Sequence, residues 1–437
     1  MLKGFRNIFQ IPELKKRIIF TLGVIAIFRI GSYIPTPGVN GRVLAEALSA
    51  QAGGIFNFLN LFSGGALYRF SIFALNIMPY ISASIIMQLL QAVIPSLEAL
   101  AKEGDDGRKK INQYTRYLTI GLCVVEGLGM TIMMRSLAPT AIHQWGIAFQ
   151  MRSVLILTTG TVFLMWLGDQ VTERGIGNGI SIIIFVNIIA RYPEMVTDTA
   201  RQVNMGLSIF SVILGTAVIL ADIFFIVLIS QAKRKIPVQY AQRVVGRKIY
   251  GGQSTYLPLR VDQAGVIAII FASSILAFPS TIASYFPHNS IMVWIKDAFG
   301  YGRGISWLYT TMYSGLIIFF CYFYTAITVN PSDVAENMKK YGGFIPGVRP
   351  GHQTAEFIDR VLTRITLVGA ISVVIIAVVP DISMQRFNLP ASWSFGGTSL
   401  LIVVGVALDT LSQIESHLVS RHYEGFIKKG KLKARVY

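Results

Sequence analysis

Residues 207–230 read LSIFSVILGTAVILADIFFIVLIS, an apolar run in which Asp222 is the single charged residue. A membrane-spanning helix needs about 20 mainly apolar residues, and this run supplies them. Inside a lipid bilayer a segment must pair its own backbone groups, which a helix does. The stretch therefore predicts that the chain crosses a membrane.

The overall composition supports a membrane protein. Of the 437 residues, 53% are hydrophobic and only 14% are charged, and the mean hydropathy is +0.56. A typical soluble domain has about 25% charged residues, so this composition excludes an ordinary soluble enzyme, a disordered chain and a coiled coil. The apolar share is enough for about ten spans with their loops.

Nine further apolar runs resemble the first and are separated by polar or Gly- and Pro-containing connections. The earliest follows a basic N-terminus, as in a signal peptide, but it is long and lacks a cleavage site, so we expect an uncleaved first span. The sequence predicts an all-α polytopic membrane protein with ten transmembrane helices near 18–34, 72–94, 117–135, 151–168, 179–192, 207–230, 264–286, 305–329, 361–380 and 397–418.

The charges predict the orientation of these spans. The chain has 39 Lys and Arg against 22 Asp and Glu, a net charge of +17. With a cytoplasmic N-terminus, 29 of the 39 basic residues fall in cytoplasmic segments and nine in external loops, as the positive-inside rule requires. Both termini are therefore expected in the cytoplasm.

Ten spans divide into five and five around the connection Arg191–Gly206. An odd number of spans per half places the two halves in opposite orientations, as in an inverted repeat. We expect an N-terminal half at 1–198, a C-terminal half at 207–418 and a basic cytoplasmic tail at 419–437.

Motifs for chemistry are missing from the sequence. The Gly-rich piece GIGNG at Gly175–Gly179 has no strand before it and no Lys after it, so it predicts a flexible cytoplasmic entry to the fifth span and not a phosphate loop. Cys123 and Cys321 lie in apolar runs, which argues against a disulfide or a metal site. We expect no enzyme activity, no cofactor and no metal.

Four charged residues fall within or near spans, and such charges are costly and often functional. An ion-coupled solute transporter would gather acidic groups near the midplane, but these charges lie on four different spans. Helix-packing or snorkelling charges are the alternative interpretation. A solute transporter is thus disfavoured, and a membrane scaffold is a third possibility. The four residues are Arg29, Glu126, Asp222 and Asp409.

Three connections are unusual. Residues Phe56–Asn76 are apolar and aromatic but interrupted by Gly64–Gly65, which fits a half-inserted helix with a hinge there, or a loop helix on the membrane surface. The basic segments 231–263 and 330–360 are longer than most connections, and the first has the pattern of a projecting hairpin. They are candidate docking sites for phospholipid headgroups, RNA or an acidic protein.

Five separate stretches carry a specific resemblance. They are similar to the SecY/Sec61-alpha family of protein translocase subunits, and the resemblance runs nearly end to end. The stretches are NIMPYISASIIMQLL (Asn76–Leu90), TGTVFLMWLGDQVTERGIGNGISIIIF (Thr159–Phe185), YAQRVVGRKIYGGQSTYLPLR (Tyr240–Arg260), GFIPGVRPGHQTAEFID (Gly343–Asp359) and FGGTSLLIVVGVALD (Phe395–Asp409).

This resemblance implies a central channel-forming subunit in the bacterial cytoplasmic membrane. Two inverted five-helix halves would surround a pore that passes unfolded secretory polypeptides across the membrane and releases helices of membrane proteins sideways into lipid. The implied partners are the SecE and SecG subunits, the SecA motor ATPase, the ribosome, signal peptides and nascent chains, and anionic phospholipids.

The resemblance also assigns roles to residues. The implied pore ring is Ile77, Ile81, Ile180, Ile184, Ile270 and Ile402. The implied plug is Phe56, Asn57, Phe58, Leu59, Asn60, Leu61, Phe62, Ser63, Gly64, Gly65, Ala66 and Leu67, within a matching segment that extends to Arg69. The implied lateral gate has Ser82, Glu126 and Phe278, and the implied docking residues are Arg243, Arg247, Lys248 and Arg349.

Overall fold

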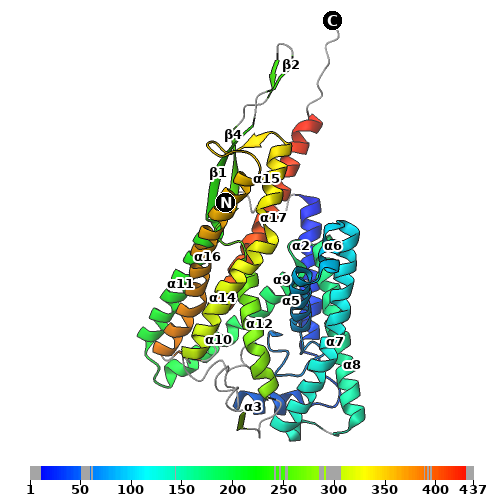
Figure 1. The fold of residues 1–437 in the computed structure, drawn as a ribbon. Helices are drawn as coiled ribbons and strands as arrows, with labels where there is room; N and C mark the ends of the chain where they lie inside the picture. Colours follow the sequence, from blue (N-terminus) through cyan, green and yellow to red (C-terminus); the bar gives the residue numbers. More distant parts are fainter. Residues whose placement is uncertain are drawn as a thin grey trace. The chain divides into compact units, whose positions relative to one another are not determined.

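The computed structural model is mainly helical (Figure 1). It describes residues 11–50, 60, 63–142, 144–240, 243–245, 248–250, 254–284, 290–291, 307–387, 389–390, 393 and 396–429. The chain forms two compact units. Unit 1 is Met1–Val196 with Val406–Tyr437, and unit 2 is Thr197–Gly405. The predicted halves divide the chain near the same connection, and they stay a prediction.

Each of the ten predicted spans contains a helix. Seven helical segments of the described chain are long and apolar enough to cross a membrane, and eight if a bent pair counts as one span. The helices are α2 (Pro12–Gly31), α5 (Met78–Val93), α7 (Asp105–Leu137), α8 (Ile147–Arg174), α9 (Gly179–Ile189), α11 (Ile209–Gln231), α12 (Gly265–Ser284), α14 (Trp307–Thr328), α16 (His352–Arg386) and α17 (Gly397–Lys429).

The second predicted span differs from the structure at its start. Residues 72–77 form turns, and α5 begins only at Met78. Asn76 has a positive φ of 53°, which is incompatible with a helix, and Pro79 suits the first turn of a helix that starts here. At its other end α5 meets α6 (Pro95–Lys102) at a bend of 100°.

In unit 1, α8 packs against α2, α7 and α9, and α5 packs against α7. Glycines bring the backbones together: a Cβ at Gly160 of α8 would collide with the Ile72 carbonyl oxygen, and one at Gly179 of α9 would collide with that of Gly168. The short elements α3 (Gly41–Ala50) and η1 (Pro139–Ala141) contact each other. A further helix, α10 (Tyr192–Asn204), follows α9.

Unit 2 has the same kind of helix packing. Helix α16 packs against α11, α14 and α15 (Pro331–Lys340), and α12 packs against α14. A Cβ at Gly397, the first residue of α17, would collide with the Ile376 carbonyl oxygen of α16. The Tyr313 hydroxyl lies 3.1 Å from the Thr398 hydroxyl, which joins α14 to α17.

The projecting hairpin predicted within 231–263 is confirmed. Strand β1 (Lys233–Tyr240) pairs antiparallel with β4 (Ser254–Arg260), and β5 (Gly343–Phe344) pairs on the other side of β1. Between β1 and β4, β2 (Arg243–Val245) pairs with β3 (Lys248–Tyr250). One face of the sheet is buried in a cluster that includes Ile236, Leu259, Ile345, Ile358 and Leu362.

The close approach at Gly160 makes a testable prediction. We expect Gly160→Val to lower the free energy of unfolding by about 1–3 kcal/mol, because the new side chain must push Ile72 away. The matched control is Gly121→Val on α7, where a Cβ meets no atom within 4 Å. Thermal unfolding of the full chain in detergent micelles checks it, and equal midpoints for the two variants would contradict the packing.

Candidate functional site

A buried segment without regular structure lies among the helices of unit 1. Residues 64–70 and 72–77 form turns, although Ala66 and Phe70 are less than 4% exposed. The helical residues Asn60 and Ser63, just before these turns, are equally buried. Gly64 and Gly65 have φ of +60° and +88°, so the chain turns at the predicted hinge. The predicted plug residues 56–59 and 61–62 lie outside the described residues.

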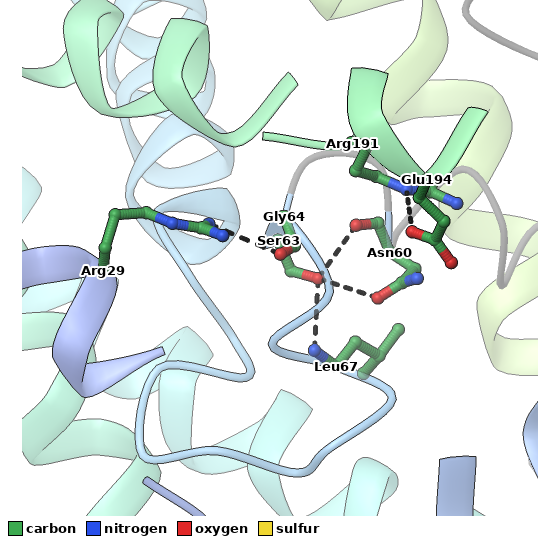
Figure 2. A network of polar contacts seen from close by, with 7 residues as sticks. All are labelled: Arg29, Asn60, Ser63, Gly64, Leu67, Arg191 and Glu194. Carbon is green, nitrogen blue, oxygen red and sulfur yellow. Dashed lines mark hydrogen bonds and ion pairs between the residues drawn. The ribbon is translucent and has the colours of Figure 1, made fainter. Parts of the chain in front are cut away.

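Local hydrogen bonds fix the shape of this segment (Figure 2). The Ser63 hydroxyl donates to the Asn60 carbonyl at 3.1 Å and accepts from the Leu67 N–H at 3.2 Å. The Gly65 N–H donates to the same Asn60 carbonyl at 3.3 Å. The Gly65 bond, five residues back to Asn60, together with the positive φ of Gly64, ends the helical residues and starts the turn.

Two helices hold Gly64 in place. The Arg29 guanidinium of α2 donates to the Gly64 carbonyl at 3.5 Å. A Cβ at Gly64 would lie 2.6 Å from the Asn187 side-chain oxygen of α9 and 3.0 Å from Arg29, so a side chain at this position fits only if these neighbours move. Asn187 is fully buried, and neither polar atom of its amide has a hydrogen-bond partner among the described residues.

Arg29, a charged residue within a predicted span, contacts several groups of the protein. Its guanidinium lies 5.6 Å from the Tyr33 ring centroid as well as beside Gly64. Arg191 and Glu194 form a further pair, 3.7 Å apart, near Asn60 in Figure 2. At Gly64 the segment therefore lies between polar groups of Arg29 on α2 and Asn187 on α9.

The segment continues toward α5 beside residues 34–36. The Thr36 N–H donates to the Phe70 carbonyl at 2.8 Å, and the Ile72 N–H donates to the Ile34 carbonyl at 3.0 Å. Phe70 is fully buried with a φ of 43°, a conformation that is unusual for a bulky residue. These long-range bonds replace the helix hydrogen bonds that the segment lacks.

The predicted pore-ring residues are divided between the units. In unit 1, Ile77 is fully buried at the start of α5 and Ile81 is half-buried, while α9 carries Ile180, half-buried, and Ile184, 5% exposed. Ile184 lies three residues before Asn187, and residues at this spacing share a helix face. In unit 2, Ile270 of α12 is half-buried and Ile402 of α17 is buried.

The predicted gate residues are also divided. Ser82 of α5 and Glu126 of α7 are half-buried on two helices that pack together in unit 1. Phe278 belongs to α12 of unit 2, which packs against α14, and its side chain lies outside the described part. That Ser82 and Glu126 face Phe278 across a gate stays a prediction.

The predicted docking residues belong to the two basic loops. Arg243 begins β2 and Lys248 begins β3, at the end of the hairpin away from the helices. Arg247 lies outside the described part. On the second loop Arg349 is exposed, and its carbonyl accepts the Thr354 hydroxyl at 2.9 Å.

A second polar contact set was not predicted from the sequence. The turn Gly175–Gly179 is tied to three helices, in contrast to the flexible entry that its glycines predicted. A glycine-rich composition indicates freedom of the backbone but does not show which side chains meet it. The Ile176 N–H donates to Thr21 at 3.1 Å, the Gly177 N–H to Gln413 at 2.9 Å and the Gly179 N–H to Thr172 at 2.9 Å.

Sequence comparisons match nearly the whole chain. A sequence model of the SecY family matches residues 71–411. The protein translocase subunit SecY of Escherichia coli (strain K12) is 49% identical over 424 residues, which cover 96% of this chain and 95% of that protein. The corresponding subunit of Thermotoga maritima is 46% identical over 443 residues, covering 100% of each.

Solved structures share the fold. One match is a SecY channel, with a TM-score of 0.65 at 18% identity, covering 97% of this chain and 95% of that one. Its plug domain is described as stabilising the closed state and maintaining a membrane seal. Sec61 in the canine ribosome–channel complex matches with a TM-score of 0.61 at 17% identity, with the same coverage. These likenesses concern the fold.

The tie between Gly177 and Gln413 gives a second prediction. Gln413→Leu removes the acceptor and leaves the buried Gly177 N–H unpaired, which costs about 1–2 kcal/mol and makes local opening about 5–30-fold more frequent. We expect trypsin to cut faster after Arg174, measured by mass spectrometry of the fragment that ends there. Gln413→Glu keeps an acceptor oxygen and should be cut at the rate of the unaltered chain. Equal cleavage rates for the two variants would show that the hydrogen bond from Gly177 to Gln413 does not hold the turn.

Proposed function

Because the chain belongs to the SecY family of protein translocase subunits, we propose that its buried turn segment closes a polypeptide pathway in the resting state. As the channel-forming subunit of the Sec translocase, the chain is a multi-pass membrane protein that transports polypeptides and is not an enzyme. A pathway wide enough for a polypeptide would also let ions through, so it must be closed when no polypeptide passes.

The observation that carries the proposal is the segment around Gly64. It is buried among spanning helices but is not itself a helix, and polar groups of Arg29 and Asn187 lie against it. Non-helical backbone at membrane depth is tolerated where protein buries it or where it lines a water-filled cavity. When the plug leaves its seat, its backbone would change from being buried by protein to lining a water-filled cavity.

The seat has weak points that suit a removable plug. The Arg29 bond to Gly64 is long, at 3.5 Å, and the Asn187 amide makes no hydrogen bond to any described residue. Displacing the part of the segment around Gly64 therefore breaks few strong polar bonds. Ile184, which belongs to the proposed pore ring, lies one turn from Asn187 on α9, and this closeness supports a pore ring near the proposed plug.

We also propose the finer roles that the family resemblance implies. Six aliphatic side chains form the pore ring, and Ser82, Glu126 and Phe278 line a lateral gate through which signal peptides and membrane helices leave into lipid. The bacterial cytoplasmic membrane holds the chain with both termini in the cytoplasm, a placement supported by the 29-to-9 distribution of basic residues. SecE and SecG complete the complex.

The cytoplasmic loops dock the partners that drive transport. Arg243, Arg247 and Lys248 on the hairpin and Arg349 on the second loop are proposed to contact the ribosome or the SecA motor. The hairpin geometry and the exposure of Arg349 support this. The likeness to a channel solved in complex with a ribosome supports it further.

Locking the plug tests the proposal. The double variant Gly64→Cys/Asn187→Cys places two cysteines close enough to form a disulfide, because a Cβ at Gly64 lies 3.1 Å from the Asn187 Cα. We expect oxidation to stop transport of a secretory precursor into proteoliposomes that contain the full translocase, and reduction to restore it. Each single Cys variant under the same oxidant is the control. Undiminished transport through quantitatively crosslinked channels would sink the plug assignment.

The pore ring has its own test, because an apolar constriction resists ions by offering no ligands to replace their water. Serine at four ring positions should wet the constriction and raise chloride conductance in planar bilayers. The ring variant carries Ile81→Ser, Ile184→Ser, Ile270→Ser and Ile402→Ser.

A matched control carries four serines at isoleucines that are 37–47% exposed on spanning helices: Ile86, Ile189, Ile275 and Ile371. We expect this variant to stay as ion-tight as the unaltered channel. Equal conductance from the ring and control variants would show that the four substituted ring positions do not form the seal.

A further inference from the structure

Three cations gather at the base of the cytoplasmic hairpin in unit 2. Lys233, the first residue of β1, lies directly opposite Arg260, the last residue of β4, in the antiparallel register. Lys235 follows two residues along β1, opposite Pro258. Directly opposed residues have their Cβ atoms about 5 Å apart, and a diagonal neighbour is about 7–8 Å away, so the three cations form one cluster.

The strand alternation places this cluster on the exposed face of the sheet. Ile236 of β1 points to the buried face, together with Leu259 of β4. Residues of opposite parity, including Lys233, Lys235 and Arg260, must point the other way. All three are exposed.

The cluster lacks matching negative charge in the described part of the unit. None of the three cations forms an ion pair there with any described carboxylate. Asp262 lies two residues beyond Arg260, but its carboxylate accepts the Gly265 N–H at 2.7 Å at the start of α12. Burial raises the pKa of Asp262, while that hydrogen bond and Arg260 oppose the shift. Like charges directly opposite across strands are destabilising, so a bound anion would stabilise this register.

The cluster lies at the depth of lipid headgroups. Helix α11 ends at Gln231, two residues before Lys233, and its 23 residues are about 34 Å long, slightly more than the roughly 30 Å hydrocarbon core. The polar layer beyond that core is about 5–8 Å thick. Arg260 likewise precedes α12 by five residues, so both opposed cations reach this layer.

We infer that the face formed by Lys233, Lys235 and Arg260 binds the phosphate of an anionic phospholipid headgroup in the adjoining leaflet. Basic clusters immediately beside a membrane span attract such lipids by about 1 kcal/mol for each Lys or Arg. Two directly opposed cations can share one phosphate, and the third adds attraction from one side. The inference rests on the proposed membrane placement and not on the plug or the gate.

The position also separates this face from the docking tip. From Lys233 to Gln239, β1 rises about 20 Å away from the end of α11, and the β2–β3 tip lies beyond it. A ribosome or motor protein can meet the tip while the base stays in the headgroup layer. The base therefore favours lipid over RNA as its occupant.

The test is lipid binding by the full chain in detergent micelles, counted by native mass spectrometry during titration with phosphatidylglycerol or phosphatidylcholine. We expect the unaltered chain to prefer phosphatidylglycerol. Lys233→Gln/Arg260→Gln should weaken phosphatidylglycerol binding about 25-fold, and Lys235→Gln alone about fivefold. Phosphatidylglycerol should also raise the unfolding temperature of the unaltered chain more than that of the double variant.

The control, Lys339→Gln/Lys340→Gln, removes two charges from exposed positions on α15 and should bind phosphatidylglycerol normally. The inference is overturned if the Lys233/Arg260 variant keeps full phosphatidylglycerol affinity, or if the unaltered chain binds both lipids equally. It is also overturned if that variant loses ribosome binding while its lipid binding is unchanged, because the face would then serve RNA.

Discussion

The structure depends on one constraint: backbone N–H and C=O groups inside lipid must find partners within the protein. The spanning helices satisfy it internally. The segment between Gly64 and Ile77 is not helical and cannot pair its backbone groups in this way. It is buried and forms hydrogen bonds with other parts of the chain: the Ile34 carbonyl, the Thr36 N–H and the Arg29 guanidinium. A non-helical segment buried in this way is a natural movable part, because its burial depends on contacts that can be exchanged for water.

The same constraint explains why glycines mark the closest contacts. Where a helix meets a carbonyl of another segment, as Gly160 meets Ile72 and Gly397 meets Ile376, a side chain would separate the two backbones. At the turn Gly175–Gly179 the backbone leaves α8 before entering α9, and side chains of α2, α8 and α17 accept its N–H groups. Packing and hydrogen bonding are therefore solved by the same residues.

Much of this fold could be predicted from local sequence. Long apolar runs give ten helices, because each run satisfies its own hydrogen bonds, and alternation gives the β1–β4 hairpin. Contacts between distant residues have no such local signal. Gln413 reaches Gly177 across 236 positions, and the pairing of Lys233 with Arg260 depends on strand register. The late start of α5 was missed because residues 72–77 are as apolar as a helix, although Asn76 and Pro79 mark the boundary. The roles of the ring, plug and gate came from family resemblance and not from periodicity.

Hydrogen–deuterium exchange along the buried segment tests the central claim most directly. The measurement compares the full translocase in nanodiscs when idle and when it holds an arrested secretory precursor. If protein contacts bury the segment at rest and a passing polypeptide displaces it, the amides of residues 63–72 exchange slowly in the idle channel and much faster in the engaged one. Equal exchange in the two states would contradict the account.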